Sequence, residues 1–223
     1  VMFFLKETLP KEKRNTNKRV NWIIEQKYFL FNSQFVTSTL AGVLAMACLF
    51  TFFSISPILL IGNLGVSVSS FAHYFGLNAL MFIFSTIVCT KLQNVTSTSN
   101  VLKIGVAVVM LSSLSMSAIA SFYKLGVMQF MVPAVAMTFG AAFIFGPAIS
   151  IAMAPFEERA GSAAAMYGAS QNIIAALIGS LIINYSNDKA DVFGLVIAIV
   201  SFLVLISLFS FVDYPSSRKN IPA

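Results

Sequence analysis

Long apolar runs separated by short polar segments organise the chain. Six such runs, each bounded by charged or turn-forming residues, lie at 36–61, 75–92, 101–123, 126–154, 161–184 and 191–212. A helix of about 20 apolar residues spans the hydrocarbon core of a bilayer, and only a helix satisfies every backbone hydrogen bond within such a run. The pattern therefore predicts a bundle of six transmembrane helices over residues 36–212.

The composition supports a membrane protein and excludes a water-soluble globule. Of the 223 residues, 58% are hydrophobic and 10% are charged, and the mean hydropathy is +0.87. Soluble domains carry about 25% charged residues. We therefore expect an all-α membrane protein.

The basic residues predict how the six helices are oriented. Twelve of the 14 Lys and Arg residues fall on one side of the predicted bundle, and only Lys124 and Lys189 fall on the other. The twelve are Lys6, Lys11, Lys13, Arg14, Lys18, Arg19, Lys27, Lys91, Lys103, Arg159, Arg218 and Lys219. By the positive-inside rule their side is cytoplasmic, together with both termini and the tail 213–223. The net charge of +6 is therefore a signal of topology and does not indicate a nucleic-acid partner.

The segment before the first span, residues 1–35, has three parts. Val1–Leu5 is apolar but too short to cross a bilayer, so we expect it to end a helix that began earlier. Residues 6–19 form a basic loop, and residues 20–35 mix aromatic and charged side chains as a short interfacial helix does. The simplest interpretation of the basic stretch is a solvated cytoplasmic loop; anionic-lipid binding or regulation is the alternative.

The residue pattern shows no catalytic or metal-binding chemistry. His73, Cys48 and Cys89 stand singly, and the chain lacks a Gly-rich phosphate loop and a Ser/His/Asp set. We therefore expect neither an enzyme nor a bound metal or cofactor. All eight acidic residues lie in loops or at span ends. Because proton-driven transporters ordinarily keep a carboxylate within the membrane, a coupling group either lies outside this sequence or is not used.

Small residues and prolines predict where helices pack closely or bend. Gly140, Gly146 and Pro147 in the fourth span favour a kink or a close helix approach. The fifth span carries a small-residue surface suited to tight contact. Its members are Gly161, Ala165, Gly168, Ala169, Ala176 and Gly179.

A few polar residues lie deep in the predicted spans. They are Thr51, Ser54, Asn78, Gln171 and Asn172. Such residues either hydrogen-bond between helices or line a wet cavity. In the first span, three phenylalanines stand beside Ser54 and Pro57, near an expected break in the helix. Aromatic and apolar walls with a few polar groups suit a cavity for poorly specified hydrophobic ligands; phenylalanines that simply face lipid are the alternative.

Five short motifs, taken in their order and spacing, resemble a known transporter family. They are Glu7-Thr8-Leu9 after an apolar turn, Phe52-Phe53-Ser54-Ile55-Ser56-Pro57, Phe75-Gly76-Leu77-Asn78-Ala79, Gly146-Pro147-Ala148-Ile149, and Ala160-Gly161-Ser162-Ala163-Ala164-Ala165 followed by Gly168 and Gln171. Over nearly the whole chain they look like the C-terminal half, helices seven to twelve, of a major facilitator transporter of the Bcr/CflA drug-resistance family. Two motif positions differ from the family: Ile55 replaces a Gly and Ala148 replaces an Asn. The loop holding Lys91 and Lys103 is also less basic than is usual in the family. Because that loop normally helps to gate the cytoplasmic side, the resemblance implies weaker gating or activity.

The resemblance implies one half of a two-lobed efflux protein. Such transporters have twelve helices in two six-helix halves built of three-helix inverted repeats, with the substrate site between the halves near the bilayer centre. Proton-coupling carboxylates usually belong to the N-terminal half. The resemblance therefore implies an all-α chain of six transmembrane helices that forms half of a major-facilitator fold. The complete protein would be a proton-coupled, bicyclomycin-type multidrug antiporter of the bacterial inner membrane. The chain would then come from a truncated or split reading frame.

The resemblance also suggests which residues contact the substrate, a small hydrophobic or drug-like molecule. The first, second, fourth and fifth spans would line the cavity, with Phe53, Ser54, Asn78, Phe143 and Gln171 as the candidate residues. Protons would be supplied through the missing N-terminal half. Two alternatives stay open: a self-contained six-helix transporter that works as a dimer, and a non-transporting membrane remnant or scaffold.

Overall fold

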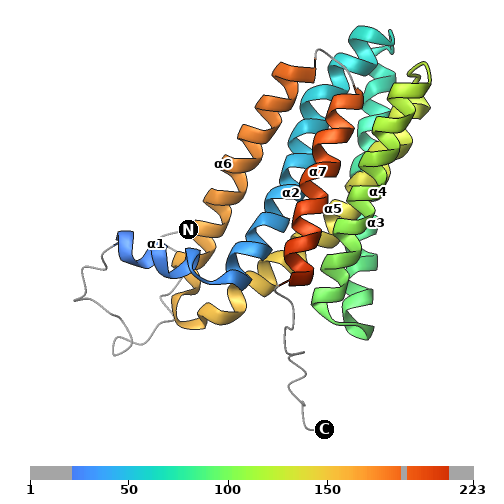
Figure 1. The fold of residues 1–223 in the computed structure, drawn as a ribbon. Helices are drawn as coiled ribbons and strands as arrows, with labels where there is room; N and C mark the ends of the chain where they lie inside the picture. The colour runs from blue at the N-terminus through green and yellow to red at the C-terminus, as the bar shows by residue number, and fades with distance from the viewer. Residues whose placement is uncertain (1–21, 187–189, 211–223) are drawn as a thin grey trace, which may run out of the picture.

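The computed structural model describes residues 22–186 and 190–210, which form a bundle of long helices with no strand among these residues (Figure 1). In chain order the elements are α1 (Trp22–Leu30), α2 (Ser33–Pro57), the π-helical η2 (Ile58–Asn63), α3 (Val68–Val95), α4 (Thr98–Phe122), α5 (Val127–Met153), the 3-10 helix η3 (Ala154–Arg159), α6 (Ala160–Ser186) and α7 (Ala190–Ser210). The expectations for Val1–Leu5, for the basic loop 6–19 and for the tail 213–223 lie outside the described residues.

Each predicted span corresponds to one long helix, but α2, α3 and α4 begin three to seven residues before their apolar runs, and two of their caps show why. The Asn32 side chain accepts a hydrogen bond from the Phe35 amide at 2.9 Å and so starts α2 at Ser33. Ser67 caps α3 in the same way through the amide of Ser70. The first turn of α3 is polar, which is why hydropathy alone placed its start seven residues later, at 75. Capping, not hydropathy, sets these two helix starts.

Four segments of the described chain are long and apolar enough to cross a membrane. They are Ser33–Asn63, Val68–Val95, Thr98–Phe122 and Val127–Phe156. In α7 the apolar stretch is shorter, Leu195–Leu208, and α6 carries Gln171 and Asn172 near its middle. The chain is an all-α membrane protein.

The expected break near Pro57 takes the form of a change in helix type. After Pro57 the chain continues as η2, in which hydrogen bonds reach further back along the chain than in an α-helix. The amide of Leu64 donates to the carbonyl of Leu59 at 2.9 Å, and Gly65 then turns the chain with a φ of 66°. The backbone stays hydrogen-bonded through the turn, as a segment at membrane depth requires.

Helix α5 is the centre of the bundle. It packs against α4, α2 and α3, while α7 packs against α4 and α6 against α2. A Cβ atom at Gly140 would lie 2.9 Å from the carbonyl oxygen of Gly105, so the α4 and α5 backbones are close at this point. The close approach predicted for Gly140 is confirmed. Gly146 has open space, and α5 continues through Pro147 to Met153; the backbone leaves helical geometry only at Phe156 (φ −125°, ψ 36°).

Helix α6 uses a different face for packing than the one its small residues suggest. The residues buried against the rest of the bundle recur every fourth position: Ala163, Tyr167, Gln171, Ala175 and Gly179. Of the predicted small-residue surface only Gly179 belongs to this set, and a Cβ there would lie 3.7 Å from Thr51 Oγ1. Gly161 and Gly168 meet nothing within 4 Å. Most of the small-residue surface is therefore unoccupied.

The two glycines of α5 form a matched pair for testing the close approach. Gly140→Ala places a methyl group against the rigid backbone of α4, and overpacking of this kind costs about 1–3 kcal/mol. Gly146→Ala meets open space and removes the entropy cost of a helical glycine, so stability stays equal or rises. Thermal unfolding of the purified chain in detergent measures both. Equal midpoints for the two variants would contradict the α4–α5 contact.

Candidate functional site

An aromatic cluster joins α2 and α3 near their connection. We define the aromatic cluster as Phe52, Phe53, Phe71, Phe75 and Phe130. The rings of Phe53 and Phe75 lie 5.4 Å apart between centroids, and Phe52 stacks on Phe75 at 6.1 Å and on Phe130 of α5 at 6.3 Å. Phe52 is buried, whereas Phe53 is 45% exposed and the neighbouring Ser54 is also exposed. The cluster thus has a packed base and an open aromatic edge.

Asn78 lies about one turn beyond Phe75 on α3 and has an unsatisfied polar atom. Its side chain is only 3% exposed, and its Oδ1 is buried without a hydrogen-bond partner. Leaving a buried acceptor unpaired costs roughly 1–3 kcal/mol, so an additional donor at this position would be stabilising. Asn78 shares its face of α3 with Ser85, whose hydroxyl donates to the carbonyl of Phe139 on α5 at 2.6 Å.

The other two predicted site residues are engaged in helix packing. Phe143 on α5 is buried beside Cys89 and Val101, where α3, α4 and α5 meet. Gln171 on α6 is buried, and its amide Nε2 donates to the carbonyl of Gly42 on α2 at 3.1 Å. The structure therefore places Phe53 and Ser54 at the exposed edge of α2 and Asn78 on the buried face of α3, and it places Phe143 and Gln171 in two separate interhelical contacts.

Sequence reasoning missed two residues at these sites. Phe75 belongs to one of the five motifs but is not among the predicted site residues, although its spacing of three from Asn78 places both on one side of a helix. Tyr167 lies over Gly42: a Cβ atom there would lie 2.9 Å from Tyr167 Cζ, and the Tyr167 hydroxyl is buried without a partner. A tyrosine four residues before Gln171 was the available signal, since residues four apart share a helix face.

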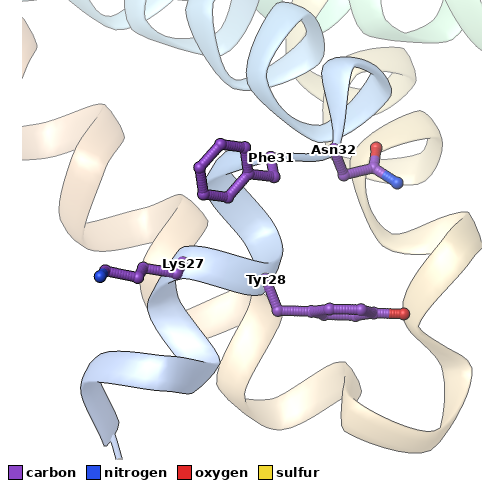
Figure 2. A pocket seen from close by; sticks show the side chains of 4 residues that line it. All are labelled: Lys27, Tyr28, Phe31 and Asn32. Carbon is purple, nitrogen blue, oxygen red and sulfur yellow. The ribbon is translucent and has the colours of Figure 1, made fainter.

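Two hollows lie beside α1, and none of the five predicted residues lines either of them. One, of about 400 Å³, is lined by Lys27, Tyr28, Phe31 and Asn32 (Figure 2). The other is a groove of about 740 Å³ between α1 and the small-residue surface of α6. Its lining residues are Gln26, Phe29, Gly161, Ser162, Ala165, Met166, Ala169, Ser170, Ile173 and Ile174. These side chains are mostly apolar or uncharged, which suits contact with a helix or with lipid.

Groups that carry catalytic or metal chemistry do not gather in the described part of the chain. Among residues 22–186 and 190–210, no three His, Cys, Asp or Glu side chains form a cluster that would hold a metal ion. Cys48 and Cys89 are buried free thiols. His73 forms a hydrogen bond through Nδ1 to the carbonyl of Ser69, 2.7 Å away, within its own helix. What the described surface offers is apolar and aromatic contact with a few polar groups.

Comparison with known proteins identifies the family. The chain is similar to a protein named bicyclomycin resistance protein homolog from Haemophilus influenzae, with 26% identity over 198 residues. The match covers 85% of this chain and 48% of that protein, so the chain spans about half the length of the curated relative it matches. No solved structure matches the chain significantly. This similarity supports the resemblance to the Bcr/CflA drug-resistance family.

The family model of the Major Facilitator Superfamily matches residues 1–180. This match extends from the segment before α1 to the second half of α6 and so covers most of the chain. Proteins of this superfamily are membrane transporters and not enzymes. The chain therefore belongs to the Major Facilitator Superfamily.

Proposed function

We propose that the chain is the C-terminal half of a proton-coupled multidrug efflux antiporter of the bicyclomycin type, in the bacterial inner membrane. The observation that carries the proposal is the similarity to a bicyclomycin resistance protein homolog of which this chain spans 48%. In a two-lobed transporter of this superfamily, one lobe supplies one wall of the substrate cavity. A truncated or split reading frame would account for the half-length match.

Exposed apolar faces on α3 and α6 support the presence of a second lobe. The buried residues of α3 are Asn78, Ser85 and Cys89. Its large exposed residues include Phe75, Leu77, Leu80, Ile83, Phe84 and Ile87. On α6 the small-residue surface is unoccupied, and small residues let transmembrane helices approach closely. We infer that the second lobe covers part of these faces and that lipid covers the rest.

The aromatic cluster is the part of the chain best suited to hydrophobic, drug-like substrates. Phe53, Phe75 and Ser54 offer an exposed apolar surface with one hydroxyl, and Asn78 Oδ1 is an acceptor without a donor. Phe143 and Gln171 would act by holding the helices that carry this wall. The acidic residues lie in loops or at span ends and not deep within a predicted span, so the carboxylates that couple transport to protons would belong to the N-terminal half.

The arrangement of the helices supports cytoplasmic termini. Helix α1, the α3–α4 connection and η3 lie at one end of the bundle (Figure 1). Lys27, Lys91, Lys103 and Arg159 belong to these elements or lie close to their ends. Lys124 lies at the opposite end, between α4 and α5. By the positive-inside rule, the end that carries α1 faces the cytoplasm.

Cysteine labelling tests whether the exposed edge of the aromatic cluster faces water. Ser54 is exposed and Ser56 is fully buried, and serine-to-cysteine replacement changes side-chain size little at both. In the assembled transporter, Ser54→Cys should react with a hydrophilic maleimide on the order of tenfold faster than Ser56→Cys, because thiol reactivity requires access to the thiolate. The native thiols of Cys48 and Cys89 are buried, so background labelling should be low. Equal slow labelling would place Ser54 against protein or lipid and contradict the cavity.

Co-expression tests the two-lobe proposal directly. The chain is expressed with the reading frame that precedes it, and efflux of ethidium is measured with and without a protonophore. We expect proton-dependent efflux only when both parts are present, because neither part alone closes a cavity and the coupling carboxylates would belong to the N-terminal part. Phe53→Ala should weaken apparent ethidium affinity roughly two- to twelvefold, the value of one aromatic contact. The control Phe122→Ala, at an exposed helix end, should leave efflux unchanged.

The same assay separates the alternatives. No gain in efflux over either part alone would count against the split antiporter and favour a non-transporting remnant or scaffold. Concentrative ethidium export by the purified 223 residues reconstituted alone would instead favour a self-contained dimer.

A further inference from the structure

Helix α1 exposes unusually large side chains for its length. It has nine residues, and Phe31, which follows it directly, is 86% exposed. Within the helix Tyr28 is 58% exposed, and Leu30 is more than half exposed. Tyr28 is partly covered by η3, whereas Leu30 and Phe31 are exposed without an aromatic partner among the described residues. A short segment that presents two aromatic rings and a leucine outward is typical of a helix that contacts the interface of a membrane.

Aromatic contacts hold α1 firmly against the body of the protein. Phe29 is fully buried, and its ring centroid lies 4.9 Å from that of Phe156 and 5.6 Å from that of Phe35. Tyr28 meets Phe156 edge-on at 5.7 Å, and the Arg159 guanidinium lies 5.3 Å from the centre of the Tyr28 ring. Edge-to-face aromatic pairs are worth about 0.5–1.5 kcal/mol beyond burial. The outward-facing side chains of α1 are therefore presented from a fixed position.

The direction of α1 places it in the plane of a membrane surface. The long helices cross the bilayer, and Figure 1 shows α1 lying across their common end, beside the base of α6. A helix in that position runs along the interface rather than through the hydrocarbon. Tyrosine and tryptophan are enriched at this depth because their rings are apolar with a polar edge.

The charge at this end of the bundle favours anionic headgroups. Lys27 is exposed, and Figure 2 shows its side chain on the same side of α1 as that of Phe31. Between them and Tyr28 lies the hollow of about 400 Å³. Of the whole sequence, the residues assigned to this side comprise twelve basic and six acidic side chains, and the other side has two of each. Under this assignment, which is the orientation proposed above, the entire net charge of +6 falls on the cytoplasmic side, the side of α1.

We propose that α1 and Phe31 form a docking surface for anionic phospholipid in the cytoplasmic leaflet. Phe31 and Leu30 insert at the boundary between headgroups and acyl chains, and the Lys27 ammonium donates hydrogen bonds to a headgroup phosphate. The hollow between Lys27 and Tyr28 accommodates part of the headgroup. This surface lies apart from the aromatic cluster, so the proposal rests on the proposed orientation of the bundle but not on the transported substrate or on the presence of a second lobe.

The single tryptophan of the chain provides a direct test. Trp22 is the first residue of α1 and the only tryptophan among the 223 residues. The full chain is reconstituted in mixed phosphatidylcholine and phosphatidylglycerol vesicles in which one lipid at a time is brominated, and quenching of Trp22 fluorescence is measured. One lysine at an anionic surface corresponds to about a fivefold local enrichment of anionic lipid. We therefore expect brominated phosphatidylglycerol to quench Trp22 fluorescence severalfold more than brominated phosphatidylcholine does. High salt should reduce this difference, because it screens the attraction between the lysine and the headgroups.

Three variants connect the signal to the proposed residues. Lys27→Gln should remove the preference for phosphatidylglycerol, whereas Lys124→Gln at the opposite end should retain it. Phe31→Ser should lower quenching by both lipids together, because α1 then sits less deeply. Lys27 and Phe31 are exposed, so these changes leave the core intact, and circular dichroism verifies this. Equal quenching by the two lipids in the unsubstituted chain, or an unchanged preference in Lys27→Gln, would overturn the proposal.

Discussion

Unpaired backbone groups are prohibitively costly in hydrocarbon, and this constraint determines the form of the whole chain. The long helices pair their amides internally, and irregular backbone is confined to their ends. Where Pro57 removes a donor, the chain changes to a π-helical turn and keeps its hydrogen bonds. Some polar side chains follow the same constraint: the hydroxyls of Thr51 and Ser201 donate to carbonyls one turn back, at 2.7 and 2.6 Å.

A few side-chain bonds to backbone carbonyls join the helices that surround α5. Gln34 on α2 donates to the carbonyl of Ile151 on α5 at 2.9 Å, Ser85 connects α3 to α5, and Gln171 connects α6 to α2. A helical carbonyl has a second lone pair, so it accepts these bonds without losing its own helical donor. Together with the glycine contact between α4 and α5, they show how uncharged polar residues contribute to helix assembly in this bundle.

The positions of the helices were readable from the sequence, but the directions of their faces were not. In a soluble protein, polar residues mark the outer face of a helix. In a membrane, both the core and the lipid are apolar, so hydropathy has almost no periodicity around the helix. The sequence therefore did not distinguish the exposed Phe53 from the buried Phe143, nor the packing face of α6 from its open small-residue surface. Gln171 and Asn78 were recognisable as unusual polar residues within apolar spans. Only the rotation of each helix shows that Gln171 donates a hydrogen bond to Gly42, whereas Asn78 Oδ1 accepts none.

The contact between α7 and α4 has a consequence for how the bundle is assembled during synthesis. Helices α4 and α5 are consecutive and joined by a short connection, so they can pair as soon as both have entered the bilayer. Helix α7 follows them by two elements and more than thirty residues, yet it packs mainly on α4. Until translation has delivered α7, one flank of α4 is covered by lipid alone. The outer layer of the bundle therefore closes only after α7 has entered the bilayer.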